Sequence, residues 1–170
     1  MLSNTGFETI ASDVLEAAKT RHVSLATAES CTGGLIMAAL TDIAGSSAVI
    51  DRAFVTYTNK AKMQMLGVEA ATLRAHGAVS EQTAIQMATG ALARASAHLV
   101  VSVTGIAGPG GGTAEKPVGS VCFGLAYKFP DTADITAFAK TVKFKDEGRA
   151  YVRRETTIHA LGMMLEALAQ

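Results

Sequence analysis

A short apolar run that passes through a tight turn into a helical pattern constrains the fold of this chain more than any other feature. Residues 23–28 are predicted to form a strand, and residues 35–40 are predicted to form the body of a helix. The turn between them contains Ser30, Cys31, Thr32, Gly33 and Gly34. A strand followed by a turn and a helix is typical of α/β folds, and it exposes the side chains of the turn at the end of a sheet.

Strands and helices alternate along the rest of the chain. Apolar patterns predict strands at residues 23–28, 48–56, 99–104, 120–127 and 135–144. Helices are predicted at residues 7–18, 35–40, 60–66, 73–76 and 81–95 and from Asp146 to about residue 165, with Asn59, Ser80 and Asp146 as N-caps. This order predicts an α/β fold, a three-layer α/β/α sandwich with a mixed central sheet. The almost wholly apolar residues 99–104 are expected to form a central strand.

Length and composition favour one domain in the cytoplasm. The 170 residues suit a single domain spanning 1–170, and no linker or repeat divides them. Fifteen basic residues balance 15 acidic ones, so the net charge leaves no electrostatic footprint for a nucleic-acid partner. No apolar run reaches the ~18 residues of a membrane span, and the first residues lack a signal sequence. We therefore expect a cytoplasmic protein with no nucleic-acid partner and no membrane partner.

The cysteines and histidines give no sign of a metal site. Cys31 and Cys122 are too few for a disulfide framework, so we expect reduced thiols. No group of His, Cys, Asp or Glu has the spacing of metal ligands, and we predict no bound metal.

The turn after the first strand offers a candidate nucleophile. The Ser30 hydroxyl can attack a carbonyl, and the backbone N–H groups of residues 31–34 can hold an anionic group or the resulting oxyanion. Two alternatives stay open. Ser30 or Thr32 can simply cap the helix. Cys31 can compete with Ser30 as the nucleophile, although a single buried thiol is usually inert packing.

A glycine-rich loop at residues 105–119 is a second candidate binding element. It follows the strand predicted at 99–104, and ligands of α/β sheets bind at the carboxyl ends of strands. The loop is neither a Walker loop nor a dinucleotide fingerprint, but glycines let a backbone approach a phosphate or ribose closely. A flexible surface connection is the alternative. The binding interpretation selects Thr104, Gly105, Gly108, Gly110 and Gly111.

A serine nucleophile needs a base, and a lysine is the candidate that the chain offers. The four histidines stand in no catalytic motif. A buried lysine loses its charge because desolvation disfavours the ammonium form, and it can then deprotonate a serine. Lys60 and Lys62 follow the second predicted strand but cannot both face one site from the start of a helix. Spacing alone leaves this choice open and also allows a solvated lysine pair.

Two arginines are candidates for binding a phosphate group. Arg149 and Arg153 lie one helical turn apart at the start of the last predicted helix. Their guanidinium groups can form a phosphate clamp. A basic, solvent-exposed helix face is the alternative.

Six short motifs occur in an order that resembles a known family. They lie at residues 28–34, 44–47, 55–62, 76–81, 104–111 and 116–121, and so extend over most of the chain. Together they are similar to the CinA C-terminal domain family, the nicotinamide-nucleotide amidases (NMN deamidases), in its stand-alone form. The resemblance implies hydrolysis of the carboxamide of nicotinamide mononucleotide to nicotinate mononucleotide and ammonia, with no metal and no cofactor.

The resemblance also implies roles for individual residues. Ser30 falls at the nucleophile and Lys62 at the base, which selects Lys62 over Lys60. Tyr57 falls at a tyrosine that relays or orients the proton. Arg149 aligns less securely, because the family tends to have Gly-Asp/Asn-Arg where this chain reads Asp-Glu-Gly-Arg at residues 146–149.

The expected partner is therefore a small-molecule nucleotide substrate, and the expected assembly is a homodimer, the commonest symmetric oligomer. Two other functions stay open. One is a non-catalytic nucleotide-binding regulatory module, associated with competence or DNA damage, in which Ser30 only caps the helix or binds phosphate. The other is hydrolysis of a different amide. A binding module has no need of a lysine base, so the joint presence of Ser30, Tyr57 and Lys62 favours catalysis.

Overall fold

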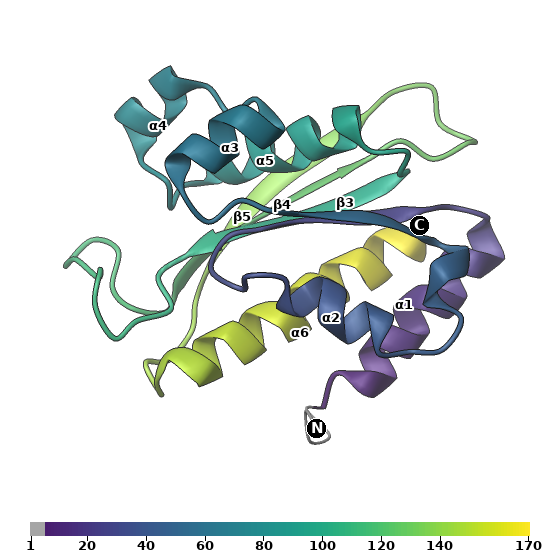
Figure 1. The fold of residues 1–170 in the computed structure, drawn as a ribbon, viewed down its shortest axis with the longest axis horizontal. Coiled ribbons are helices and arrows are strands. Elements are labelled where there is room, and N and C mark those ends of the chain that lie inside the picture. Colours follow the sequence, from purple (N-terminus) through teal and green to yellow (C-terminus); the bar gives the residue numbers. More distant parts are fainter. Residues whose placement is uncertain (1–5) are drawn as a thin grey trace.

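A mixed sheet lies between two layers of helices (Figure 1). The structure, a computed structural model, describes residues 6–170. The strands are β1 (Leu25–Glu29), β2 (Ile50–Val55), β3 (Leu99–Gly105), β4 (Ser120–Tyr127) and β5 (Thr136–Lys143). Their order is β2-β1-β3-β4-β5, in which β1 is parallel to β2 and β3 while β4 is antiparallel to β3 and β5. The predicted three-layer α/β fold with a mixed sheet is confirmed.

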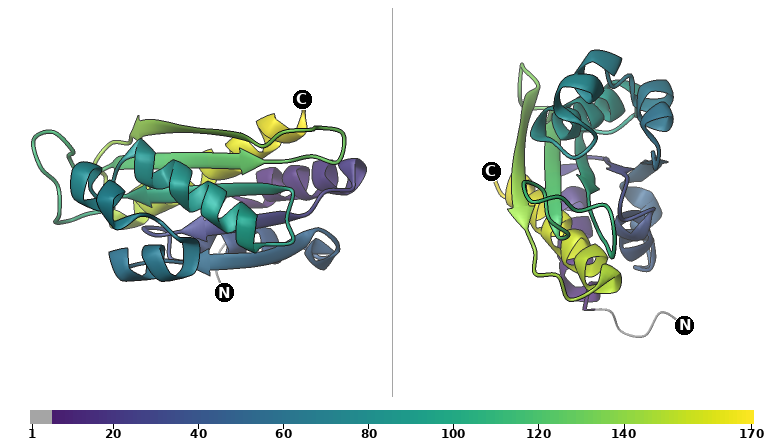
Figure 2. Two further views of the ribbon diagram at one scale, coloured as in Figure 1. Left: turned by 90° about the horizontal axis from the view of Figure 1, so that it is seen from above. Right: turned by 90° about the vertical axis from the view of Figure 1, so that its left-hand side faces the viewer.

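The helices divide between the two faces of the sheet, as Figure 1 and the right-hand view of Figure 2 show. One face carries α3 (Asn59–Leu66), α4 (Ala70–His76) and α5 (Glu81–Arg94); the other carries α1 (Glu8–Arg21), α2 (Leu35–Thr41) and α6 (Arg149–Leu168). A short 3-10 helix, η1 (Ser46–Ala48), precedes β2 and was not predicted. Within residues 6–170, no helix is long and apolar enough to cross a membrane.

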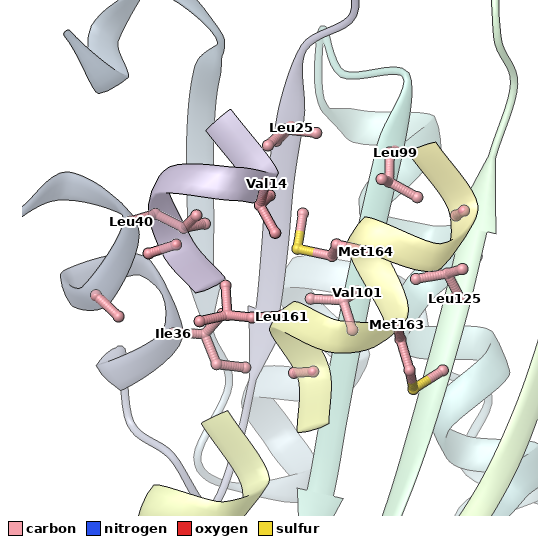
Figure 3. Packing of buried hydrophobic residues seen from close by; sticks show 14 of the residues in the cluster. Val14, Leu25, Ile36, Leu40, Leu99, Val101, Leu125, Leu161, Met163 and Met164 are labelled. Carbon is pink, nitrogen blue, oxygen red and sulfur yellow. The ribbon is translucent and has the colours of Figure 1, made fainter. Parts of the chain in front are cut away.

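The central strand β3 is buried on both faces, as predicted from its apolar composition. Leu99 and Val101 point into the larger hydrophobic core, where they meet Met164 of α6 (Figure 3). Val100 points into a second core beneath α5. Because alternate residues of a strand face opposite sides, a strand in this position is largely apolar, and its buried hydroxyls, Ser102 and Thr104, both donate hydrogen bonds to backbone carbonyls.

Two predicted helix caps are wrong. The N-cap of α3 is Thr58 and not Asn59, because Thr58 is extended and its hydroxyl accepts the N–H of Ala61 at 3.0 Å. The N-cap of α6 is Gly148 and not Asp146, whose carboxylate instead accepts the N–H of Gly148. The cap predicted for α5 is confirmed, since Ser80 accepts the N–H of Thr83.

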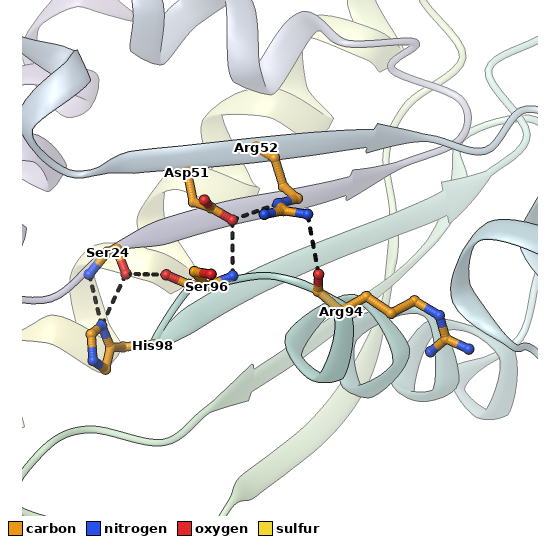
Figure 4. A network of polar contacts seen from close by, with 6 residues as sticks. All are labelled: Ser24, Asp51, Arg52, Arg94, Ser96 and His98. Atoms are coloured by element: carbon orange, nitrogen blue, oxygen red, sulfur yellow. Dashed lines mark hydrogen bonds and ion pairs between the residues drawn. The ribbon is translucent and has the colours of Figure 1, made fainter.

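A polar network closes the amino-terminal edge of the parallel strands (Figure 4). The Asp51 carboxylate accepts bonds from Arg52 Nε at 2.6 Å and from the backbone N–H of Ser96 at 3.0 Å. The Ser24 hydroxyl donates to the Ser96 carbonyl at 2.8 Å. These bonds tie β1 and β2 to the connection between α5 and β3. The carboxyl edge of the same strands carries Ser30 and the glycine-rich loop.

Candidate active site

Ser30 and Lys62 are in direct contact. Lys62 Nζ donates a hydrogen bond to Ser30 Oγ at 2.9 Å and another to the carbonyl of Thr56 at 3.0 Å. Ser30 directly follows β1, where its backbone N–H bonds the Val103 carbonyl of the neighbouring strand. The two side chains therefore meet at the carboxyl edge of the parallel strands, the usual position for a ligand in an α/β sheet.

The position of Lys62 follows from where α3 begins. The Thr58 cap fixes the start of the helix, and Lys62 and Leu66, four residues apart, share its buried face. The Lys62 side chain is only 1% exposed, whereas Lys60 is exposed to solvent. The structure thus brings Lys62, and not Lys60, to Ser30.

Burial changes the chemistry of the Lys62 amine. Desolvation lowers the pKa of Lys62 from its ordinary value of 10.5, and the nearby Cys31 opposes this shift. A neutral amine has a lone pair that can accept the proton of a hydroxyl within hydrogen-bond distance. Lys62 therefore lies within hydrogen-bond distance of the Ser30 hydroxyl, and its lowered pKa favours the neutral form of the amine.

The thiol next to Ser30 has the opposite property. Cys31 is buried, and desolvation raises its pKa from 9.0 to about 11. Since the thiolate is the reactive form of cysteine, a thiol with this pKa is a poor nucleophile near neutral pH. Of the two adjacent candidates, Ser30 has the better chemistry.

Glu29 organises the nucleophile turn, and sequence reasoning did not single it out. Its fully buried carboxylate accepts backbone N–H bonds from Gly34, Ile36 and Met37 at 2.9–3.1 Å. It also accepts the hydroxyl of Thr32 at 2.7 Å. An ionised carboxylate against the first turn of α2 satisfies the free N–H groups and the positive end of the helix dipole. The sequence feature that could have identified Glu29 is a charged residue directly after a largely apolar predicted strand.

This arrangement limits which backbone groups of the turn can meet a ligand. The Gly34 N–H is donated to Glu29, and the Gly33 N–H is donated to the carbonyl of Ser30 at 3.1 Å. Gly34 is the N-cap of α2 with a φ of 99°, a conformation that suits glycine. Thr32, Gly33 and Gly34 therefore shape the turn and do not line the cavity in front of Ser30.

A cavity of about 190 Å³ opens in front of Ser30 and Lys62. Of the residues predicted for the site, those that line it are Ser30, Cys31, Tyr57, Lys62, Thr104, Gly105 and Arg149. Further lining residues that sequence reasoning missed are Asn59, Ala78, Val79 and Ala107. A Cβ at Gly105 would lie 2.9 Å from the Ser120 carbonyl, so a larger residue would displace the start of the glycine-rich loop.

Arg149 joins the glycine-rich loop to Tyr57 at the mouth of this cavity. Its guanidinium donates to the Gly108 carbonyl and to the Tyr57 hydroxyl, each at 3.0 Å. Tyr57 is 60% exposed. Gly108, Gly110 and Gly111 do not line the cavity, and the last two are exposed. The loop thus lines the cavity only through Gly105 and Ala107. Arg149 binds the loop farther along, at the carbonyl of Gly108.

Arg153 lies behind the nucleophile turn. One helical turn along α6 from Arg149, it donates to the carbonyl of Thr32 at 2.7 Å. The two arginines predicted as a phosphate clamp are therefore separated, since only Arg149 lines the cavity. Within residues 6–170, no group of three or more His, Cys, Asp or Glu side chains could hold a metal ion.

Comparison with known proteins identifies relatives over nearly the whole chain. The family model described as "CinA C-terminal domain" matches residues 7–168. "Nicotinamide-nucleotide amidohydrolase PncC" of Escherichia coli (strain K12) is 47% identical over 161 residues, which cover 95% of this chain and 94% of that protein. A "CinA-like protein" of Chlorobaculum tepidum is 53% identical over 133 residues, 78% of this chain but only 31% of that longer protein.

Solved structures also match this chain over nearly its whole length. The competence/damage inducible protein CihA from Agrobacterium tumefaciens superposes with a TM-score of 0.88 at 51% identity, covering 96% of each chain. A competence damage-inducible protein A (ComA) from Klebsiella pneumoniae superposes with a TM-score of 0.87 at 36% identity, covering 96% of this chain and 98% of that one.

Proposed function

The chain belongs to the CinA C-terminal domain family, and we propose that it is a nicotinamide-nucleotide amidase that hydrolyses nicotinamide mononucleotide to nicotinate mononucleotide and ammonia. The family resemblance expected from the sequence motifs is confirmed, and relatives that match over 95% of this chain are named nicotinamide-nucleotide amidohydrolase. The observation that carries the proposal is the 2.9 Å contact between Ser30 Oγ and the buried amine of Lys62.

In the first step, Ser30 Oγ attacks the carboxamide carbon while the neutral amine of Lys62 takes the hydroxyl proton. The tetrahedral intermediate carries a negative oxygen, and N–H donors near such an oxygen contribute about 3–4 kcal/mol each in comparable sites. The intermediate then expels the amide nitrogen, which receives the proton from Lys62 and leaves as ammonia. The product of this step is an ester between Ser30 and the nicotinoyl group.

In the second step, water hydrolyses that ester. Lys62 is neutral again and accepts a proton from the attacking water. Ser30 Oγ leaves and recovers the proton from Lys62, so that nicotinate mononucleotide is released and both side chains return to their starting states. One lysine can serve both steps because it accepts and returns one proton in each.

Tyr57 and Arg149 orient the substrate in this proposal. The hydroxyl of Tyr57 lies at the cavity mouth, where it can relay or orient the proton of the leaving group. Two guanidinium nitrogens of Arg149 already donate to Tyr57 and Gly108. Arg149 therefore holds Tyr57 and the loop in place and adds a positive charge near the substrate. Of the other predicted substrate-binding residues, the proposal keeps Cys31, Thr104 and Gly105, which line the cavity. It does not keep Thr32, Gly33, Gly34, Gly108, Gly110 and Gly111, which do not line it.

We further expect the enzyme to act in the cytoplasm as a homodimer, without a nucleic-acid or membrane partner. The balanced charge of the chain supports the expected lack of a nucleic-acid partner. Light scattering of the purified protein tests the dimer, and a monomeric mass at micromolar concentration would contradict it.

Chromatography of reaction products tests the proposed activity. Purified protein incubated with nicotinamide mononucleotide is expected to form nicotinate mononucleotide, and a fluorophosphonate probe is expected to label Ser30. Nucleotide binding without product and without labelling would identify a binding module. Labelling of Ser30 without product from this nucleotide would identify an amidase for another substrate.

A further inference from the structure

A second cavity, larger than the one at Ser30, opens at the same edge of the sheet. Its volume is about 530 Å³. Its floor is a patch of β4 and β5 in which Ser120 pairs with Lys143 and Cys122 pairs with Thr141. Residues paired across two strands share a face of the sheet. This patch lies on the face that α5 covers farther along β4, where Ala84 of α5 packs against Gly124.

Ser120 provides the observation that points to a ligand. Its side chain is only 2% exposed, and its hydroxyl has no hydrogen-bond partner in the described part of the chain. Buried hydroxyls are nearly always paired, because an unsatisfied one carries a free-energy penalty. Since Ser120 alternates with Val121, which lies in the core on the opposite face, its side chain points to the cavity side. A ligand oxygen there would pair this hydroxyl.

The walls supply groups that attract an anion. Lys143 lines the floor, and Lys116 lines a wall, where its amine is held by the carbonyl of His76 at 3.0 Å. Glu81 and Gln82, the first two residues of α5, also line the cavity. Among the first N–H groups of α5, the Ser80 hydroxyl accepts only that of Thr83. The N–H groups of Glu81 and Gln82, in the first turn, have no intrahelical acceptor and can donate to an anion.

The same walls also carry acceptors for hydroxyl groups. Glu81 and Glu115 both line the cavity, and the Thr141 hydroxyl fixes the Glu81 carboxylate by donating to it at 2.8 Å. A lone anion would gain nothing from two carboxylates. A phosphorylated sugar would use both kinds of group, because its phosphate accepts from ammonium and N–H groups while its hydroxyls donate to carboxylates.

We propose that this second cavity binds a ribose 5-phosphate group. Val79 lines both cavities, so they adjoin each other. Ser120 lies two strands away from the strand that precedes Ser30, about 10 Å at the usual spacing of strands. A mononucleotide can span this distance, with its carboxamide at Ser30 and its phosphate beside Lys143. Assigning the ribose phosphate to the substrate rests on the proposed function, whereas the binding of ribose 5-phosphate does not.

Isothermal titration calorimetry with ribose 5-phosphate tests the site, because it measures binding and does not depend on enzyme activity. Lys143→Met is expected to weaken binding about tenfold, whereas Lys145→Met, which removes the same charge outside the cavity, leaves the Kd unchanged. Ser120→Ala is expected to weaken binding about fivefold without lowering the melting temperature, because its hydroxyl has no partner to lose. Equal Kd values for wild type, Lys143→Met and Ser120→Ala would overturn the proposal.

Kinetics then identify the source of the phosphate. If it belongs to the substrate, Lys143→Met raises the KM for nicotinamide mononucleotide about tenfold and leaves the KM for nicotinamide riboside unchanged. If ribose 5-phosphate binding falls while both KM values stay constant, the cavity binds a separate phosphorylated ligand. A protein that binds ribose 5-phosphate through Lys143 but releases no ammonia would contradict the proposed activity and leave this site intact.

Discussion

Lys62 Nζ lies 2.9 Å from Ser30 Oγ although the two residues are 32 positions apart in the sequence. Each is fixed by a different element, Ser30 by the end of β1 and Lys62 by the buried face of α3. The amine is largely removed from solvent, and its desolvation lowers the pKa of Lys62 and so favours the neutral form that a base requires. The contact therefore joins position and reactivity in one pair of side chains.

Lys62→Met is expected to lower kcat by at least about a thousandfold while leaving the fold intact, because methionine fills the buried volume without supplying a base. Lys60→Met is the matched control, since it makes the same substitution at an exposed position two residues away. Circular dichroism checks the fold of both variants. Near-native kcat in Lys62→Met would show that another group accepts the proton.

The pH dependence of activity follows from the lowered pKa of Lys62. Because the neutral amine is the active form, kcat/KM is expected to rise with pH through the pKa of Lys62 and to level off below 10.5, the ordinary lysine value. A profile measured between pH 5 and 10 tests this expectation. A rate that falls as pH rises over that range would require the charged form of Lys62.

Stability should depend on the same group. The folded protein binds fewer protons at Lys62 than the unfolded chain does, so the free energy of unfolding gains a contribution that increases with pH from the folded pKa up to 10.5. Chemical denaturation at several pH values should therefore show a smaller increase in Lys62→Met than in wild type or Lys60→Met. Parallel curves for all three proteins would mean that Lys62 is charged in the folded state.

Glu29→Ala is expected to destabilise the protein by about 3 kcal/mol or more, because it leaves several buried N–H and hydroxyl groups of the turn without an acceptor. Glu29→Gln keeps the shape and should lower kcat more than it changes KM, since the turn positions Ser30 and not the substrate. Urea denaturation and steady-state kinetics measure both effects, with the exposed Glu16→Gln as control. Wild-type stability in Glu29→Ala would exclude this role.

Cys31→Ala is expected to keep kcat within about threefold of wild type, because a thiol with a pKa of about 11 is almost entirely protonated at neutral pH. For the same reason, iodoacetamide should modify Cys31 slowly at pH 7. Activity should not be lost faster than the protein unfolds. Loss of activity in Cys31→Ala comparable to that in Lys62→Met would instead identify the thiol as the nucleophile.

Most of the fold could be predicted from periodicity, because the strands and long helices of this chain carry clear apolar patterns. The strand at 99–104 and the cap at Ser80 are examples in which local chemistry decides the structure. The caps at Asn59 and Asp146 were wrong, because a neighbouring threonine or glycine had the backbone conformation that a cap needs. Local propensity does not distinguish such neighbours.

The candidate site was only partly predictable for a physical reason. Ser30 and the glycine-rich loop stand out as local motifs, but the choice of Lys62 over Lys60 depends on which face of α3 packs on the sheet. Glu29 belongs to the motif at 28–34, but its role could not be predicted, since it arises from five donors that β1, the turn and the first residues of α2 bring together. Ala78 and Val79 reach the cavity only because the chain before α5 crosses the end of β3.

Ammonia release from nicotinamide mononucleotide by the purified protein, in the presence of EDTA, tests the central claim most directly. Ser30→Ala should be measured alongside Ser47→Ala, which changes an exposed serine in the same way. We expect release by wild type and Ser47→Ala and a loss of at least about a thousandfold in Ser30→Ala. Equal release by Ser30→Ala and wild type would contradict the assignment of Ser30 as the nucleophile, and no release by wild type would contradict the proposed activity itself.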